Sequence, residues 1–221
     1  DGLALLIDHA PPHVQIVVGT RADPRLPLAR LRARGDLVEV RAADLRFTAA
    51  ESAAYLTDAM GLTLSEHDVE SLEGRTEGWI AGLQMAAVSL QGRADVAEFI
   101  AAFAGSHRHI LDYLSEEVYR SQPEEVRRFL VRTSVLDRFA AQLCSAIMAP
   151  EAPGAAGMDT QEAQRIREHL EHANLFVVPL DDDRRWYRYH HLFADLLRLR
   201  LAQEEPAGAS LLHLRASAWF E

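Results

Sequence analysis

The segment 175–201 constrains the fold of this chain more than any other part of the sequence. It consists of an apolar strand (175–180), an acidic turn (181–183), an aromatic strand (186–189) and an amphipathic helix that opens with His190 and His191. Helical patterns precede and follow this two-stranded ribbon. The order of helix, helix, ribbon and closing helix is typical of a winged-helix unit. A histidine fixed between a sheet and a helix N-terminus is also well placed to contact a phosphate.

Helices dominate the sequence from Phe47 onward, and several of their starts are marked. Thr48 with Glu51 forms a capping box, and Ser65 with Asp68 forms a looser version of it. Gly61 is predicted to end the first of these helices. Apolar residues at helical spacing and helix-start residues predict further helices near 76–90, 95–103, 110–118, 124–130, 161–173, 190–201 and 209–220. A surface loop is predicted for 150–158, which is rich in Gly, Ala and Pro.

Residues 1–42 carry a different, α/β pattern. Short helices are predicted for 3–9 and 26–34, and buried-type strands for 13–18 and 37–40. Continuous apolar strands normally lie inside a parallel sheet that is covered on both faces, and two strands cannot make such a sheet. The sequence therefore predicts a mainly α chain with three parts: the C-terminal part of a larger α/β domain (1–42), a helical domain (43–105) and a winged-helix-like domain (106–221).

Bulk composition excludes several functions. The formal net charge of −10 argues against duplex-DNA binding by this segment, because such binding requires clustered cations. No run approaches the roughly 18 apolar residues that span a bilayer, and the first residues lack the cationic start of a signal peptide. With a single cysteine, Cys144, expected as a buried apolar side chain, the sequence favours a cytoplasmic location.

The loop after the first predicted strand is a candidate phosphate contact. Open α/β sheets bind ligands beyond the carboxyl ends of their strands, and Thr20 and Arg21 stand at that position. The guanidinium of Arg21 could reach a terminal phosphate, and the Thr20 hydroxyl could donate a hydrogen bond. A plain surface loop in which Arg21 pairs with Asp23 is the alternative.

The histidine pair has three interpretations. A zinc site requires three or four ligands at coherent spacing, and neither His190–His191 nor the nearby acidic turn supplies an evident set. Nucleophilic catalysis requires a nucleophile and an orienting acid that the sequence does not place. A histidine that caps the helix is the structural alternative. The acidic turn 181–183 is more typical of a solvated turn than of a cation site.

Taken in order, these motifs resemble the MalT-like, LuxR-family ATP-dependent transcriptional activators, which belong to the STAND class of P-loop ATPases. The matches extend over nearly the whole chain. They are VVGTRADP (17–24), LPLARLR (26–32), LRFTAAE (45–51), RTEGWIAGLQ (75–84), EEVRRFL (124–130), NLF (174–176) and WYRYHHLF (186–193).

The resemblance implies a segment that begins late in the nucleotide-binding domain and continues through a helical lid and a winged helix. It implies that Arg21 senses the terminal phosphate, that Trp79 and Ile80 lie near adenine, and that His190 contacts the β-phosphate of ADP. The sequence departs from the family pattern at three positions. Gly19 replaces the usual Ser or Thr, Ile80 stands where related lids often have proline, and His191 stands where other branches have aspartate.

The resemblance also implies cofactors and partners. The parent protein is expected to bind ATP or ADP with Mg²⁺, whereas this segment lacks the glycine-rich phosphate loop and is expected neither to hydrolyse ATP nor to hold nucleotide tightly alone. Its expected partners are the nucleotide-binding, sensor and DNA-binding domains of the same protein, and further copies on activation. A helical interaction scaffold without a nucleotide role is the alternative, and a metal-dependent hydrolase built on His190, His191 and 181–183 is a third hypothesis.

Overall fold

The computed structural model describes residues 2–11, 13–20, 23–93, 95–103, 108–150 and 157–220, and within these ranges it is mainly α-helical. The elements are α1 (Gly2–His9), α2 (Leu28–Arg34), α3 (Ala49–Ala54), η1 (Tyr55–Ala59), α4 (Glu66–Thr76), α5 (Ile80–Leu90), α6 (Val96–Ala102), α7 (Arg108–Tyr113), η2 (Leu114–Tyr119), α8 (Glu124–Thr133), α9 (Ala141–Ile147), α10 (Thr160–His172), β1 (Val177–Pro179), β2 (Tyr187–Tyr189), α11 (His191–Glu204) and α12 (Gly208–Phe220).

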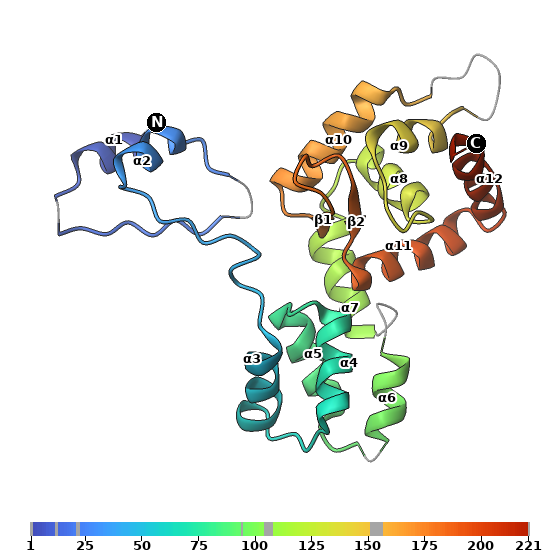
Figure 1. Cartoon of the computed structure of the whole chain (residues 1–221), viewed down its shortest axis with the longest axis horizontal. Helices are drawn as coiled ribbons and strands as arrows, with labels where there is room; N and C mark the ends of the chain where they lie inside the picture. Colours follow the sequence, from blue (N-terminus) through green and yellow to red (C-terminus); the bar gives the residue numbers. More distant parts are fainter. Residues whose placement is uncertain are drawn as a thin grey trace.

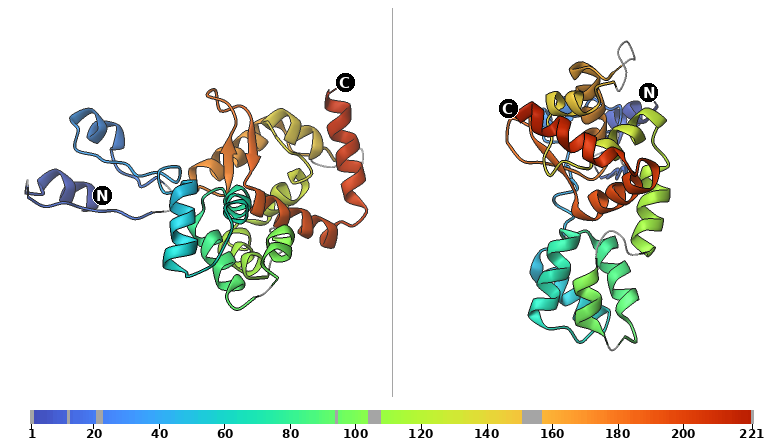
Figure 2. Two further views of the ribbon diagram at one scale, coloured as in Figure 1. Left: turned by 60° about the horizontal axis from the view of Figure 1, so that its bottom comes forward. Right: turned by 90° about the vertical axis from the view of Figure 1, so that its right-hand side faces the viewer.

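These elements form three groups in space. Figure 1 shows an extended N-terminal arm (residues 2–46) with α1 and α2, a helical lid (α3 to α6), and a winged-helix unit built from α8 to α12 and the β1–β2 ribbon. The helix formed by α7 and η2 runs from the lid to the winged-helix unit, and both views of Figure 2 agree on this. The boundaries at 42 and 105 stay a prediction, because nothing in the structure tests them.

Both predicted capping boxes are present. The Thr48 hydroxyl accepts from the Glu51 amide at 3.3 Å, and the Glu51 carboxylate accepts from the Thr48 amide at 2.9 Å. Ser65 and Asp68 make the same reciprocal pair at the start of α4. Because each box satisfies orphan backbone donors, it stabilises its helix by about 1 kcal/mol. These caps fix where the first lid helices begin.

The expected helix start near Thr76 was wrong. Thr76 is the last residue of α4, and α5 begins at Ile80. Between them, Glu77 and Gly78 both have positive φ, 50° and 70°, which a right-handed helix cannot accommodate. The resulting turn moves the start of the second helix from the expected Thr76 to Ile80, and it places Glu77 at the interface between the lid and the winged-helix unit.

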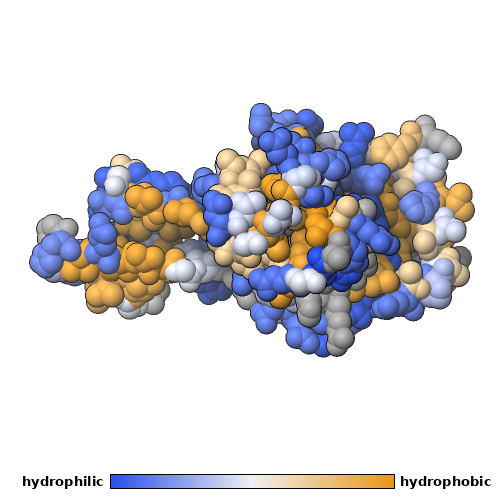
Figure 3. Space-filling model, turned by 90° about the horizontal axis from the view of Figure 1, so that it is seen from below, coloured by the Kyte–Doolittle hydropathy of each residue, from blue (hydrophilic) through white to orange (hydrophobic). Residues whose placement is uncertain are grey.

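The two strands expected in the arm are also absent from the described residues. Residues 14–20 and 36–40 have no regular secondary structure, whereas α1 and α2 form as predicted. A strand is stabilised by backbone hydrogen bonds to a neighbouring strand, and within the described ranges neither segment pairs with another. Val17 and Val38 are consequently 93% and 89% exposed. Figure 3 shows apolar surface gathered on the arm.

The ribbon packs into the core of the winged-helix unit as predicted. β1 and β2 pair antiparallel with Val177 opposite Tyr189, and Phe139 adds two backbone hydrogen bonds to Tyr187 on the other edge of β2. Phe139, Tyr187 and Phe193 are fully buried. Tyr187 of β2 contacts α10, and Tyr189 contacts α8 and α11. This packing fixes where the chain enters α11 at His190.

Several smaller predictions have outcomes. Cys144 is buried, as expected. The acidic segment 181–183 forms a turn, in which the Asp181 carboxylate accepts from the amides of Arg185 and Trp186. Much of the predicted loop 150–158 lies outside the described residues. Within the described ranges, no helix is both long enough and apolar enough to cross a bilayer.

Candidate functional site at the junction of lid and winged helix

The junction is organised around the carboxylate of Glu77. This side chain is only 8% exposed and lies at the C-terminal end of α4. Arg188 of β2 donates to it with both guanidinium nitrogens, Nη1 to Oε1 at 2.7 Å and Nη2 to Oε2 at 2.9 Å. Such a two-pronged contact matches the planar guanidinium to the carboxylate, so it fixes orientation as well as charge.

Further groups approach the same carboxylate, among them the His191 ring, whose Nδ1 lies 3.4 Å from Oε1. The backbone amide of His191, the first residue of α11, donates to Oε1 at 3.1 Å. Arg46, from the arm, lies 3.4 Å from Oε2. A carboxylate at a helix N-terminus also interacts favourably with the helix dipole. Glu77 therefore contacts the arm, the ribbon and α11 from its position in the lid.

These contacts determine the protonation state of Glu77. Burial of the carboxylate acts to raise its pKa, but the hydrogen bonds from Arg188, the nearby His190 and the His191 amide outweigh burial and lower the pKa from 4.5 to about 2. Glu77 is therefore ionised at neutral pH. Its negative charge is matched by Arg188, which is 26% exposed.

His190 is buried between the two units, with 3% of its side chain exposed. Its Nε2 lies 2.9 Å from the carbonyl oxygen of Thr76 and must carry the hydrogen that this contact requires. Its Nδ1 is buried without a hydrogen-bond partner and lies 4.0 Å from Oε1 of Glu77. Burial lowers the pKa of His190 despite the neighbouring carboxylate, which favours the neutral ring with a bare Nδ1.

Aromatic rings surround His190 on the remaining sides. Trp79 of the lid lies 6.2 Å from the His190 ring and 5.0 Å from Phe176, measured between centroids, and Phe176 lies 5.6 Å from His190. Phe176 has a φ of 55° and accepts a hydrogen bond from the His190 amide at 2.8 Å. This packing excludes water from the imidazole and holds the entrance of α11 against the lid.

The predicted site residues divide into two sets. Trp79 and His190 come together at the junction, and Ile80 follows Trp79 as the first residue of α5. Thr20 belongs to the arm, where its segment has no regular structure and is exposed, and Arg21 lies outside the described residues. The proposed nucleotide contacts of all five residues are therefore left as predictions.

The sequence reasoning missed Glu77 and Arg188 as site residues. Both stand inside motifs that were noted, RTEGWIAGLQ and WYRYHHLF, but their pairing joins residues 111 positions apart. The usable signal was the Glu-Gly step, since a glycine after a helical pattern often marks a left-handed terminus. Nothing in the sequence could have named Arg188 as the partner.

The other interpretations of the histidines have outcomes as well. His190 occupies the N-cap position of α11, and Tyr187, Leu192 and Phe193 are buried as the capping alternative expected, but the His190 side chain makes no capping hydrogen bond. Within the described residues, no group of three or more His, Cys, Asp or Glu side chains is arranged to hold a metal ion. The junction accordingly shows a histidine in an aromatic cage beside an ion pair.

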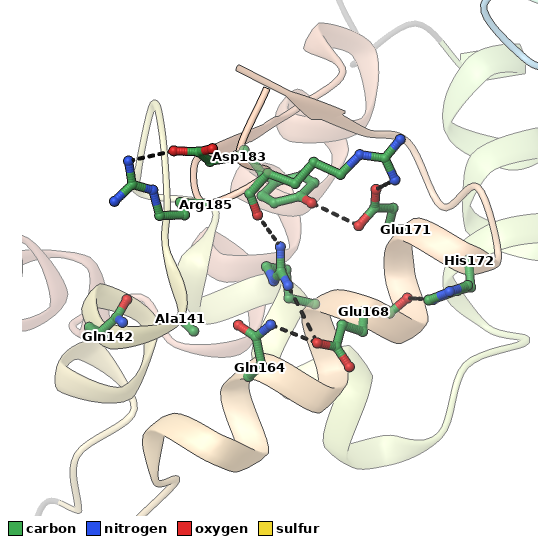
Figure 4. A pocket seen from close by; sticks show the side chains of 11 residues that line it. Ala141, Gln142, Gln164, Glu168, Glu171, His172, Asp183 and Arg185 are labelled. Atoms are coloured by element: carbon green, nitrogen blue, oxygen red, sulfur yellow. Dashed lines mark hydrogen bonds and ion pairs between the residues drawn. The ribbon is translucent and has the colours of Figure 1, made fainter. Parts of the chain in front are cut away.

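A separate hollow of about 350 Å³ lies beside the ribbon turn, between α10 and the start of α9 (Figure 4). Its carboxylates already have donors: Gln164 donates to Glu168 at 2.6 Å, and Tyr187 donates to Glu171 at 2.7 Å. The hollow shares none of its lining residues with the Glu77 and His190 cluster. Its polar groups stabilise the ribbon on α10.

Comparison with known proteins agrees with this architecture. The family model for the MalT winged helix domain matches residues 115–209. The chain is 38% identical over 218 residues to the serine/threonine-protein kinase PknK of Mycobacterium tuberculosis (strain ATCC 25618 / H37Rv). This match covers 99% of this chain and 19% of that protein. It is 30% identical over 226 residues to the HTH-type transcriptional regulator MalT of Vibrio campbellii, covering 100% of this chain and 24% of that regulator.

A similar match extends to MalT of Klebsiella pneumoniae, at 30% identity over 220 residues, 99% of this chain and 23% of that regulator. The chain thus spans about a fifth to a quarter of the length of these relatives. The matched winged-helix region contains the ribbon, His190 and α11 described above. Residues 115–209 are therefore a winged-helix domain of the MalT family, and the chain as a whole is MalT-like.

Proposed function

We propose that this chain is the regulatory segment of an ATP-dependent transcriptional regulator of the LuxR-related STAND class, in which bound ADP or ATP is coupled to a conformational switch. Similarity to MalT regulators along the whole chain supports a regulatory role. The observation that carries the nucleotide part is the buried Nδ1 of His190, which has no hydrogen-bond partner. An unpaired buried polar atom is costly, and a bound ligand, ion or water is one explanation for such an atom in a native protein.

The residues at the junction fit a nucleotide phosphate in chemical type. The negative charge of a phosphate would favour the protonated ring, whose Nδ1 could then donate to a phosphate oxygen. Trp79 lies beside His190, and Ile80 is proposed to add apolar surface there. Thr20 and Arg21 of the arm are proposed as further contacts. When bound, the nucleotide with Mg²⁺ would supply a charged group whose interaction differs between the diphosphate and triphosphate forms.

A switch requires that the ligand distinguish two arrangements of the protein. The described arrangement, with His190 closed against the lid, is proposed as the resting one. A nucleotide shifts the equilibrium only by the difference of its affinities for the two arrangements, typically a few kcal/mol. The chain's own part is to hold the imidazole at the junction through the Thr76 carbonyl and the Phe176 backbone.

The proposal assigns no catalytic step to this chain. Hydrolysis, inducer sensing and DNA binding are assigned to other domains of the parent protein, and self-association is expected on activation. The alternative scaffold function predicted an exposed apolar patch across 97–114. Of the described apolar side chains there, Phe99, Ile100, Phe103 and Ile110 are buried, whereas Tyr113 is 39% exposed, and one exposed ring does not make a patch. The structure thus gives the scaffold function no specific support.

The test is His190→Ala in the full-length protein that carries this chain. We expect faster loss of ADP during purification and a higher basal level of transcription, because the contact that closes the resting arrangement is removed. His67→Ala, at an exposed position of α4, is the matched control and should change neither quantity. If nucleotide occupancy and basal transcription are unchanged in His190→Ala, the nucleotide switch is refuted and the scaffold function is preferred.

A further inference from the structure

We propose that Glu77 is an ionic latch that docks the winged helix on the lid and positions His190, and that it does so without nucleotide. The latch is the cluster of the Glu77 carboxylate, the Arg188 guanidinium and the His191 amide. It goes beyond the nucleotide switch, because every contact in it is made by the chain itself. A carboxylate on one unit and a guanidinium on the other form the central contact across the junction.

The geometry places three hydrogen bonds across the junction on one side chain. Oε1 accepts from Arg188 of the ribbon at 2.7 Å and from the His191 amide of α11 at 3.1 Å, while Oε2 accepts from Arg188 at 2.9 Å. His191 follows His190 directly, so fixing its amide fixes the point at which the imidazole enters the junction. Loss of the Glu77 charge would release the ribbon and the start of α11 together.

Burial makes the pair dependent on both partners. Glu77 is 8% exposed and Arg188 is 26% exposed, so either charge without the other would remain largely withdrawn from water. Removing one member of a buried ion pair is much more costly than the pair's net contribution, because the remaining charge is uncompensated. The latch should therefore open when either residue is neutralised, and neutralising both residues should open it little more than neutralising one.

The backbone conformation on both sides of the junction indicates that contacts across it hold the two units in place. Glu77 has a φ of 50° in the lid, and Phe176 has a φ of 55° in the winged-helix unit. Non-glycine residues occupy this region at a cost and remain there when surrounding contacts fix them. The two residues lie at the same junction, Glu77 bonded to Arg188 and Phe176 packed on Trp79. Opening the latch would let both relax.

The two units are closely packed beside the latch. A Cβ atom on Gly82 of α5 would come within 2.9 Å of the Trp79 ring and 3.4 Å of Leu192 of α11. Leu192 therefore lies within van der Waals reach of the lid helix α5. The helix of α7 and η2 connects the units on another side and contains a π-helical turn, a rare feature that is frequently found at functional sites.

The experiment is amide hydrogen exchange on the whole chain without nucleotide. The reporters are the amides of Trp79 and His190, which lie on the two sides of the junction and keep their own acceptors, Thr76 and Phe176. In Glu77→Gln we expect their protection to fall about tenfold or more, because charge-assisted hydrogen bonds are lost. The Phe139 amide, bonded to Tyr187 inside the winged-helix unit, should keep its protection.

Matched variants separate a latch from a general loss of stability. Glu70→Gln removes one charge from an exposed position of the same helix and should leave protection unchanged. Arg188→Gln should reproduce the effect of Glu77→Gln, and the double variant should add little to it. Arg188→Lys, which keeps the charge but loses the fork, should be intermediate.

Two results would overturn the latch: unchanged protection of both reporters in Glu77→Gln, or an equal loss at the Phe139 amide, which would give Glu77 a merely structural role. Because nucleotide is absent throughout, neither result affects the nucleotide switch. That proposal is tested separately by ADP retention in His190→Ala. The latch can therefore be refuted while the nucleotide switch is supported, and the nucleotide switch can be refuted while the latch is supported.

Discussion

Replacement of Gly78 by alanine should destabilise the chain strongly, because the turn between α4 and α5 has no room for a side chain. A Cβ atom at this position would lie 2.3 Å from the carbonyl oxygen of Phe47 and 3.0 Å from its nitrogen. Both are backbone atoms, so no rotamer change relieves the overlap. The φ of 70° adds a conformational cost of about 1–2 kcal/mol for a residue with a Cβ.

The overlap also threatens a hydrogen bond. The Phe47 amide donates to the Gly78 carbonyl at 2.8 Å, and displacing Phe47 from Gly78 breaks this contact at a cost of about 1 kcal/mol. Together with the conformational cost and residual strain, Gly78→Ala should lower the free energy of unfolding by about 3 kcal/mol. Urea unfolding followed by circular dichroism measures this quantity directly.

Two other glycines separate the conformational cost of a positive φ from the cost of steric overlap. Gly92 has a φ of 75° with open space around its Cβ position, so Gly92→Ala should show the conformational cost alone, about 1–2 kcal/mol. Gly74 lies inside α4 with no atom within 4 Å of its Cβ position, so Gly74→Ala should stabilise the chain by about 0.5–1 kcal/mol. A Gly78→Ala cost equal to that of Gly92→Ala would refute the steric argument.

Four further outcomes follow from the geometry. Thr133→Val should lower the free energy of unfolding in urea by about 1–3 kcal/mol, which is more than Tyr189→Phe should. The reason is that it leaves the buried Tyr189 hydroxyl, 2.7 Å from the Thr133 hydroxyl, without a hydrogen-bond partner; equal losses for the two variants would contradict this. Glu77→Gln should be less stable than the parent at neutral pH. Because the Glu77 pKa is lowered from 4.5 to about 2, this difference should persist above pH 4.5 and vanish as the pH falls toward 2; a difference constant with pH would contradict the assigned ionisation. Burial raises the pKa of the Cys144 thiol, so a thiol reagent should modify it only after unfolding, and rapid labelling of the native chain would refute its burial. Thr48→Ala should cost about 1 kcal/mol in thermal or urea unfolding, whereas no loss would mean that the cap is not needed.

Local sequence signals were sufficient where the structure depends on neighbours in the chain. The capping boxes at Thr48 and Ser65 formed because each needs only a residue three positions away. The ribbon and α11 formed where alternation and helical spacing placed them, since those periods reflect local backbone geometry. His190 was correctly singled out as a residue fixed between ribbon and helix.

Local signals failed where an element needs a partner from elsewhere. The apolar segments 13–18 and 37–40 have the composition of strands, but a strand also requires a neighbouring backbone, and none pairs with them in the described ranges. The helix expected to begin near Thr76 begins later for a related reason. The helical spacing of apolar residues includes Thr76 and Trp79, but the tertiary contacts of Glu77 and Gly78 favour positive φ between them. Periodicity carries no information about such contacts.

The sequence by itself determined the helices, the ribbon and the MalT-like order of motifs, because these follow from propensity and spacing along the chain. Only the tertiary structure decided that Glu77 meets Arg188 and that His190 is buried with one bare nitrogen. The reason is physical: the pKa of Glu77 and the burial of His190 depend on charges and rings brought together from residues more than a hundred positions apart, and the docking of the two units alone brings them within contact distance.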